Sequence, residues 1–177
     1  MKNLSPLGLL VLLCASPVYA AMTDFKAGPV FTEYGKHAAI DGVTIAPTET
    51  FKIAFDAVKG AEPGSINRKF DTLARFINMH VANGAKLENI HLAIVVHGTA
   101  TFDVLSSAAY KQVKGVENAN TPLIQALINK GVRFIVCGQS AAAKDISADM
   151  LEKGVEVELS AMTAHARLQK QGYTLNP

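Results

Sequence analysis

Residues 134–140 read Phe-Ile-Val-Cys-Gly-Gln-Ser, and this stretch decides which fold the sequence predicts. Its first four residues are apolar, as in a short buried strand, and the glycine after Cys137 favours a turn into a helix. Open α/β sheets bind their ligands at strand ends of this kind. The unpaired N–H groups and the positive dipole end of the following helix both favour a thiolate. The sequence therefore predicts a reactive thiol at Cys137.

Strands and helices alternate on both sides of this stretch. Residues 90–96 form an apolar run that is typical of a strand buried on both faces of a parallel sheet. Ser65 is a suitable N-cap for a long helix over residues 66–82, in which apolar residues from Ile66 onward recur every three or four positions. The remaining expected elements are strands at 51–58, 155–159 and 173–175, helices at 121–130 and 161–170, a short helix or lid at 102–110 and a loop at 111–120. The alternation predicts an α/β protein with a mostly parallel sheet between helices.

The first 20 residues differ from the rest of the chain. Lys2 precedes an apolar run at residues 7–13, and Val18-Tyr19-Ala20 gives the small-residue pattern of a cleavage site. This is the pattern of a secretory signal peptide cut after Ala20, which predicts a periplasmic or secreted protein. Residues 21–49 carry closely spaced turn signals and are expected to form an N-terminal arm, followed by the α/β domain at 50–177.

Charge and hydropathy restrict the partners that the sequence favours. The chain has 17 Lys and Arg against 15 Asp and Glu, and cleavage of the leader would remove only Lys2. A formal charge so close to zero argues against a nucleic-acid partner, which would require a basic surface. A membrane-spanning helix needs about 20 apolar residues, and no stretch of the sequence qualifies.

Several polar residues follow predicted strands and are expected to share one rim of the sheet. His97 follows the 90–96 strand, and if that strand neighbours the cysteine strand, its imidazole lies within reach of the Cys137 thiol and stabilises the thiolate or acts as its base. The alternative is that His97 only satisfies a loop carbonyl, and that Ser140 and Ser160 are helix caps. The candidate ligand-binding residues on this rim are Gly98, Thr99, Gly138, Gln139, Ser140 and Thr163.

Other kinds of site lack their signatures. His97, His165 and Cys137 are possible metal ligands, but no closely spaced pair of ligands accompanies them, so no metal is expected. There is no G-x-G-x-x-G, no P-loop and no G-x-S-x-G, so no nucleotide cofactor and no hydrolase elbow is expected. A single cysteine in an exported domain is either buried and inert, bridged to another molecule, or used chemically.

The order of these segments resembles the DsrE/DsrF-like (YchN-like) family, in its exported single-domain branch. The resemblance rests on Ile94-Val95-Val96-His97-Gly98, on Val136-Cys137-Gly138-Gln139-Ser140, on Leu159-Ser160-Ala161-Met162-Thr163 and on Gln171-Gly172-Tyr173. It implies a three-layer α/β/α sandwich with a sheet of about five strands, and assembly into trimers or hexamers. In cytoplasmic sulfur-relay members a cysteine at this strand end carries sulfur as a persulfide.

The sequence therefore leads to two alternative functions. In the first, an exported carrier, rather than a turnover enzyme, handles sulfur or thiols through Cys137 with the help of His97, and its partners are a sulfur donor or acceptor protein or a small thiol. In the second, a non-catalytic module binds a small ligand or has a structural role in a homo-oligomer, with Cys137 as part of the pocket wall.

Overall fold

A computed structural model of the protein describes residues 25–176, so the predicted leader at residues 1–20 lies outside the described residues. Five strands form one all-parallel sheet in the order β4-β3-β2-β1-β5. The strands are β1 (Phe51–Ala57), β2 (Ile90–Val96), β3 (Arg133–Cys137), β4 (Val155–Glu158) and β5 (Thr174–Asn176). All five carboxyl ends therefore open onto the same rim, as the sequence predicts.

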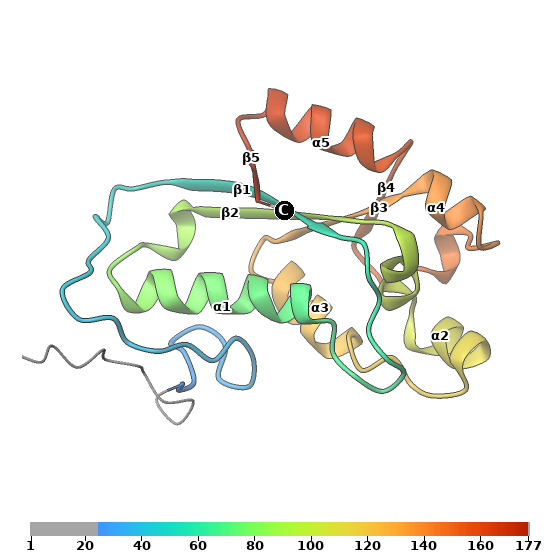
Figure 1. Ribbon diagram of the computed structural model, residues 1–177, viewed down its shortest axis with the longest axis horizontal. Coiled ribbons are helices and arrows are strands. Elements are labelled where there is room, and N and C mark those ends of the chain that lie inside the picture. Colours follow the sequence, from blue (N-terminus) through green and yellow to red (C-terminus); the bar gives the residue numbers. More distant parts are fainter. Residues whose placement is uncertain (1–24, 177) are drawn as a thin grey trace, which may run out of the picture.

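Helices cover both faces of this sheet and make three layers (Figure 1). The helix α1 (Arg68–Ala82) and the helix α3 (Thr121–Ile128) lie on one face, and α5 (Ala161–Lys170) lies on the other. Shorter elements occupy the connections, namely α2 (Ser107–Lys114), α4 (Gly138–Ala142) and the 3-10 turns η2 (Leu87–Asn89), η3 (Gly98–Val104) and η4 (Ala148–Met150). The predicted three-layer α/β/α fold is confirmed.

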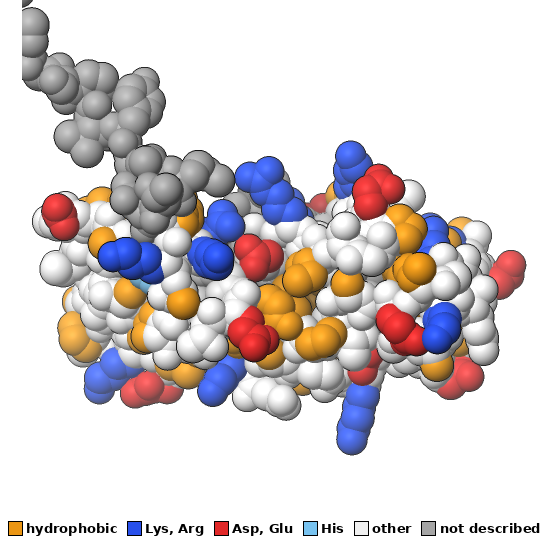
Figure 2. Space-filling model, turned by 90° about the horizontal axis from the view of Figure 1, so that it is seen from below, with side chains coloured by type: hydrophobic (Ala, Val, Ile, Leu, Met, Phe, Trp, Pro, Cys, Tyr) orange, Lys and Arg blue, Asp and Glu red, His pale blue; other side chains and the backbone are white. Residues whose placement is uncertain are grey.

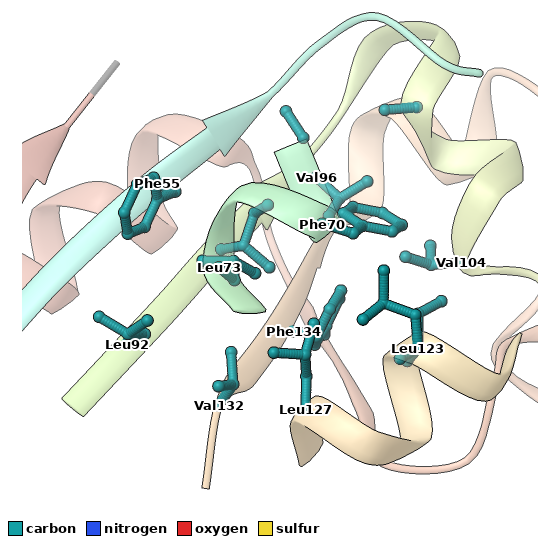
Figure 3. Packing of buried hydrophobic residues seen from close by; sticks show 14 of the residues in the cluster. Phe55, Phe70, Leu73, Leu92, Val96, Val104, Leu123, Leu127, Val132 and Phe134 are labelled. Atoms are coloured by element: carbon teal, nitrogen blue, oxygen red, sulfur yellow. The ribbon is translucent and has the colours of Figure 1, made fainter. Parts of the chain in front are cut away.

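The main core fills the space between the sheet and the α1–α3 layer. Phe70 of α1 meets Phe134 of β3 edge to face at 5.1 Å, and Leu123 and Leu127 of α3 complete the cluster (Figure 3). Successive side chains of a strand point to opposite faces. The alternate residues of the strands therefore form a smaller core under α5, made of Ala54, Ala93, Val95, Ile135, Ala164 and Leu168.

The segment that precedes β1 packs against the outer side of α1. Asn78 of α1 is fully buried, and its side chain accepts hydrogen bonds from the N–H groups of Val30 and Phe31 at 3.1 and 2.9 Å. The same amide donates to the carbonyls of Phe31, Tyr34 and Gly35. One buried side chain thus fixes the path of residues 30–35.

Two local predictions differ from the structure. α1 begins at Arg68, with Asn67 rather than Ser65 as its N-cap, and Ile66 lies before the helix with an exposed side chain. Long-range contacts hold Asn67 at this position, because its side chain donates a hydrogen bond to Asp103 and its backbone N–H donates one to Asn120. The short helix or lid expected at 102–110 corresponds to the end of η3 and the start of α2. Because α2 continues to Lys114, the loop expected at 111–120 covers only residues 115–120.

The surface gives two further observations. On the side of α1, α2 and α3, basic and acidic side chains are mixed over the molecule, with apolar side chains between them (Figure 2). Among residues 25–176, none of the helices is long and apolar enough to cross a membrane.

Candidate functional site

Cys137 is both the last residue of β3 and the N-cap of α4. It is the free cysteine of the described residues and is 5% exposed. The backbone turns here because Gly138 lets the chain pass close to the end of β4: a Cβ atom at this position would lie 2.9 Å from the carbonyl oxygen of Glu158. The local sequence therefore places a mostly buried sulfur atom at the rim, between an inner strand and the start of a helix.

Neutral hydrogen-bond donors surround the sulfur. The N–H of Ser140 donates to Cys137 Sγ at 3.4 Å. Burial on its own raises the pKa of the Cys137 thiol, but hydrogen bonds from the Ser140 side chain and from the N–H groups of Ser140, Ala161 and Gln139 outweigh it and lower the pKa overall. Since Ala161 is the first residue of α5, the sulfur faces the start of a second helix in addition to α4.

The imidazole of His97 is hydrogen-bonded to Asp56 rather than to the thiol. His97 Nε2 lies 3.1 and 3.0 Å from the two carboxylate oxygens of Asp56 in β1. His165 of α5 contacts the same carboxylate, with its Nε2 2.8 Å from Oδ1. Burial alone raises the pKa of Asp56, but the hydrogen bonds and charges of His165 and His97 lower it overall.

Strand alternation explains why these side chains share one face of the sheet. Asp56, His97 and Cys137 each lie two residues beyond Ala54, Val95 and Ile135, which form the small core under α5. Asp56, His97 and Cys137 therefore all belong to the face that α5 covers.

The other predicted ligand-binding residues fall into two groups: some lie at Cys137, and others are engaged in local hydrogen bonds elsewhere. The Thr99 hydroxyl accepts a hydrogen bond from the N–H of Gly60, and Thr163 is bound to the N-cap Ser160 through its N–H and its hydroxyl. The N–H of Gly98 donates to Ser140 Oγ at 3.3 Å. Gln139 is exposed, and its backbone N–H donates to the Cys137 thiol. Gly98, Gly138, Gln139 and Ser140 are thus brought to Cys137, whereas the Thr99 and Thr163 side chains are engaged elsewhere.

Sequence reasoning missed Asp56 and the N–H of Ala161, and it associated His165 only with a metal. Within residues 25–176 no group of three or more His, Cys, Asp or Glu residues has a geometry that could hold a metal ion. A hollow of about 250 Å³ lies between β4 and α5, and it is lined by Arg133, Glu156 and Arg167 together with Ile135, the residue two before the cysteine. The signal that could have indicated Asp56 is its acidic side chain near the end of a mostly apolar strand.

The fold and the site together define a class: α/β proteins with an all-parallel, five-stranded sheet that present a cysteine at the carboxyl end of an inner strand. The sequence profile of the DsrE/DsrF-like family matches residues 52–177, and the chain belongs to this family. The resemblance to the DsrE/DsrF-like family seen in the sequence is thereby confirmed.

Several solved structures are similar to this chain, and two of them show the shared fold. One is a protein of unknown function, MTH1491, from Methanobacterium thermoautotrophicum, with 20% identity and a TM-score of 0.54. The other is the YchN protein of E. coli, with 21% identity and a TM-score of 0.51. Each alignment covers 71% of this chain and 97% of the other chain. No curated protein matches the sequence.

Proposed function

We propose that this protein carries sulfane sulfur as a persulfide on Cys137. The observation that carries the proposal is the set of hydrogen-bond donors around Sγ, which lowers the pKa of a thiol that burial alone would raise. Membership of the DsrE/DsrF-like family supports the same chemistry. A lower pKa increases the thiolate fraction, and it also makes Cys137 a better leaving group when the sulfur is passed on.

The transfer is an exchange between two sulfur atoms with no net oxidation. The Cys137 thiolate attacks the outer sulfur of a donor persulfide, the S–S bond of the donor breaks, and the donor leaves as a thiolate. An acceptor thiolate then attacks the outer sulfur on Cys137, and the electron pair of that S–S bond returns to Cys137 Sγ. The same N–H groups that hold the thiolate before loading receive it again after release.

Burial sets a condition on the donor. Because Cys137 is only 5% exposed, a donor must be small or must present its sulfur on a narrow extension. Leu159 and Met162 flank the N-cap of α5 with side chains that are 66% and 81% exposed, and they offer apolar contacts to a partner protein.

The experiment that tests the proposal is intact-mass spectrometry after exposure to inorganic polysulfide. The full chain is used with Cys14→Ser, so that Cys137 is the remaining cysteine. We expect a mass increase of one sulfur atom that a reductant removes, and we expect it to be absent in the matched Cys137→Ser variant. An unmodified protein, or an adduct that persists in Cys137→Ser, contradicts the proposal.

Export and self-association are further parts of the proposal. The signal-peptide pattern at residues 1–20 supports export, and amino-terminal sequencing of the protein from a periplasmic extract should begin at Ala21. The exposed side chains of Val157, Leu159 and Met162 support an apolar contact between copies. Light scattering coupled to gel filtration measures the number of subunits, and a monomer at all concentrations would contradict self-association.

A further inference from the structure

Asp56 occupies an unusual place among the polar residues of the α5 face. Its carboxylate is hydrogen-bonded to both His97 and His165. The side chains of Asp56, His97 and His165 are 23%, 28% and 18% exposed, so all three are less than one-third exposed. These two histidines are the residues whose hydrogen bonds and charges act on the carboxylate. Each histidine also belongs to a segment that reaches the Cys137 sulfur.

The first segment runs through His97. The next residue, Gly98, has a left-handed backbone conformation with φ of +57° and donates its N–H to Ser140 Oγ at 3.3 Å. Ser140 in turn donates its own N–H to Cys137 Sγ at 3.4 Å. Because Gly98 directly follows His97 in the chain, the contact that holds the His97 ring also positions the Gly98 N–H, which orients the Ser140 side chain.

The second segment runs through α5. His165 lies four residues after Ala161, so the two residues share one side of the helix, one turn apart. The N–H of Ala161 is one of the donors that lower the thiol pKa. The bond of 2.8 Å between His165 and Asp56 therefore anchors the first turns of α5 to β1, and with them the Ala161 donor.

We propose that Asp56 is a positioning residue that holds, through His97 and His165, the two groups of hydrogen-bond donors around the Cys137 sulfur. It does not touch the sulfur in this arrangement. This proposal rests on the proposed function only for the role of Cys137 as a sulfur carrier. The hydrogen bonds around the thiol are a property of the protein before any sulfur is bound.

The sign of one measurement separates this role from simple electrostatics. A carboxylate near a thiol disfavours the thiolate, so removing the charge of Asp56 would lower the thiol pKa if charge alone acted. If Asp56 instead positions the donors, its removal loosens them and raises the thiol pKa. The two explanations predict shifts in opposite directions.

The test measures the pH dependence of Cys137 alkylation by iodoacetamide in the full chain carrying Cys14→Ser. In Asp56→Ala we expect the midpoint to rise by about one pH unit, which is about a tenfold lower thiolate fraction at pH values below the midpoint. Asp56→Asn keeps an acceptor oxygen without the charge, so its midpoint should lie between those of Asp56→Ala and the parent.

Asp71→Ala is the matched control. Asp71 lies in α1, on the opposite face of the sheet from α5. It accepts a hydrogen bond from the N–H of Gly35 at 2.7 Å and forms an ion pair with Arg75 of the same helix. Its loss should therefore destabilise the protein and leave the alkylation midpoint of Cys137 unchanged. A midpoint that is unchanged or lowered in both Asp56 variants overturns the inference. If Asp56→Ala fails to fold, the Asn variant decides. Failure of the parent to accept sulfur would refute the proposed function and leave this result standing.

Discussion

The substitution Asn78→Ala provides a direct measure of how the N-terminal segment is held on the domain. The Asn78 side chain makes five hydrogen bonds to the backbone of residues 30–35, and its residue is 0% exposed. Alanine keeps the helical backbone and removes every one of these bonds. It leaves the N–H of Phe31 without its partner in a buried environment, and the N–H of Val30 without its partner in a partly buried one.

The expected cost follows from these contacts. A net contribution of about 1 kcal/mol per hydrogen bond gives an upper value near 5 kcal/mol, but the segment can move outward and let water satisfy part of its backbone. We therefore expect Asn78→Ala to lower the free energy of unfolding by about 3 kcal/mol, at the upper end of typical single substitutions. For a domain of this size that corresponds to a fall in Tm of roughly 6–12 °C.

Urea denaturation followed by circular dichroism measures this change, and hydrogen exchange shows where it acts. The amides of Val30 and Phe31 should lose their protection in Asn78→Ala, while the amides of β2 should keep most of theirs. The matched control is Asn129→Ala, which removes an exposed asparagine at the C-cap of α3 and should change stability by less than about 0.5 kcal/mol. A loss below about 1 kcal/mol in Asn78→Ala, with Val30 and Phe31 still protected, would refute the reasoning.

Three further predictions concern the rim. Ser160→Ala removes the side chain that accepts the N–H of Thr163 at 3.1 Å, and the lost N-cap should cost about 1 kcal/mol in urea denaturation. Gly98→Ala places a Cβ atom 2.6 Å from the Val58 carbonyl oxygen at a positive φ, so it should cost more than about 1 kcal/mol and raise the alkylation midpoint of the thiol. Because the pKa of Asp56 is lower in the folded protein than in the unfolded chain, its carboxylate stabilises the fold above a pH of about 4 and loses this effect as the pH falls. Asp56→Asn should therefore flatten the fall of the urea midpoint between about pH 5 and pH 3, and an unaltered pH profile would contradict this.

The inner strands β2 and β3 were predictable from the sequence because burial on both faces leaves little room for polar residues, whereas β1 and β4 were indicated by alternating side chains. β2 consists of the residues expected for it, and β1 and β4 each end one residue before the expected end. The start of α1 was not predictable, since Ser65 and Asn67 are both suitable caps by local rules. The choice between them is made by Asp103 and Asn120, which lie 36 and 53 residues further along the chain.

The candidate site divides in the same way. The position of Cys137 at a strand end followed from three local features: an apolar run, a glycine and a helix start. The partner of His97 did not, because Asp56 lies 41 residues earlier and meets the ring only once β1 is placed beside β2. His165 is 109 residues from Asp56, and no sequence spacing indicates that contact.

The use of His97 to bind Asp56 changes the chemistry expected of the thiol. A cysteine paired with a histidine depends on the protonation of the imidazole, so its thiolate is supported only while the ring carries a charge. Here the donors are backbone N–H groups and a hydroxyl, which keep their hydrogens throughout the physiological pH range. A fixed set of neutral donors at the starts of two helices is also screened little by salt when it is buried. Under the proposed function we therefore expect the reactivity of Cys137 to depend on how well the chain holds these donors in place, and so on the packing of α5 on the sheet rather than on a neighbouring charge.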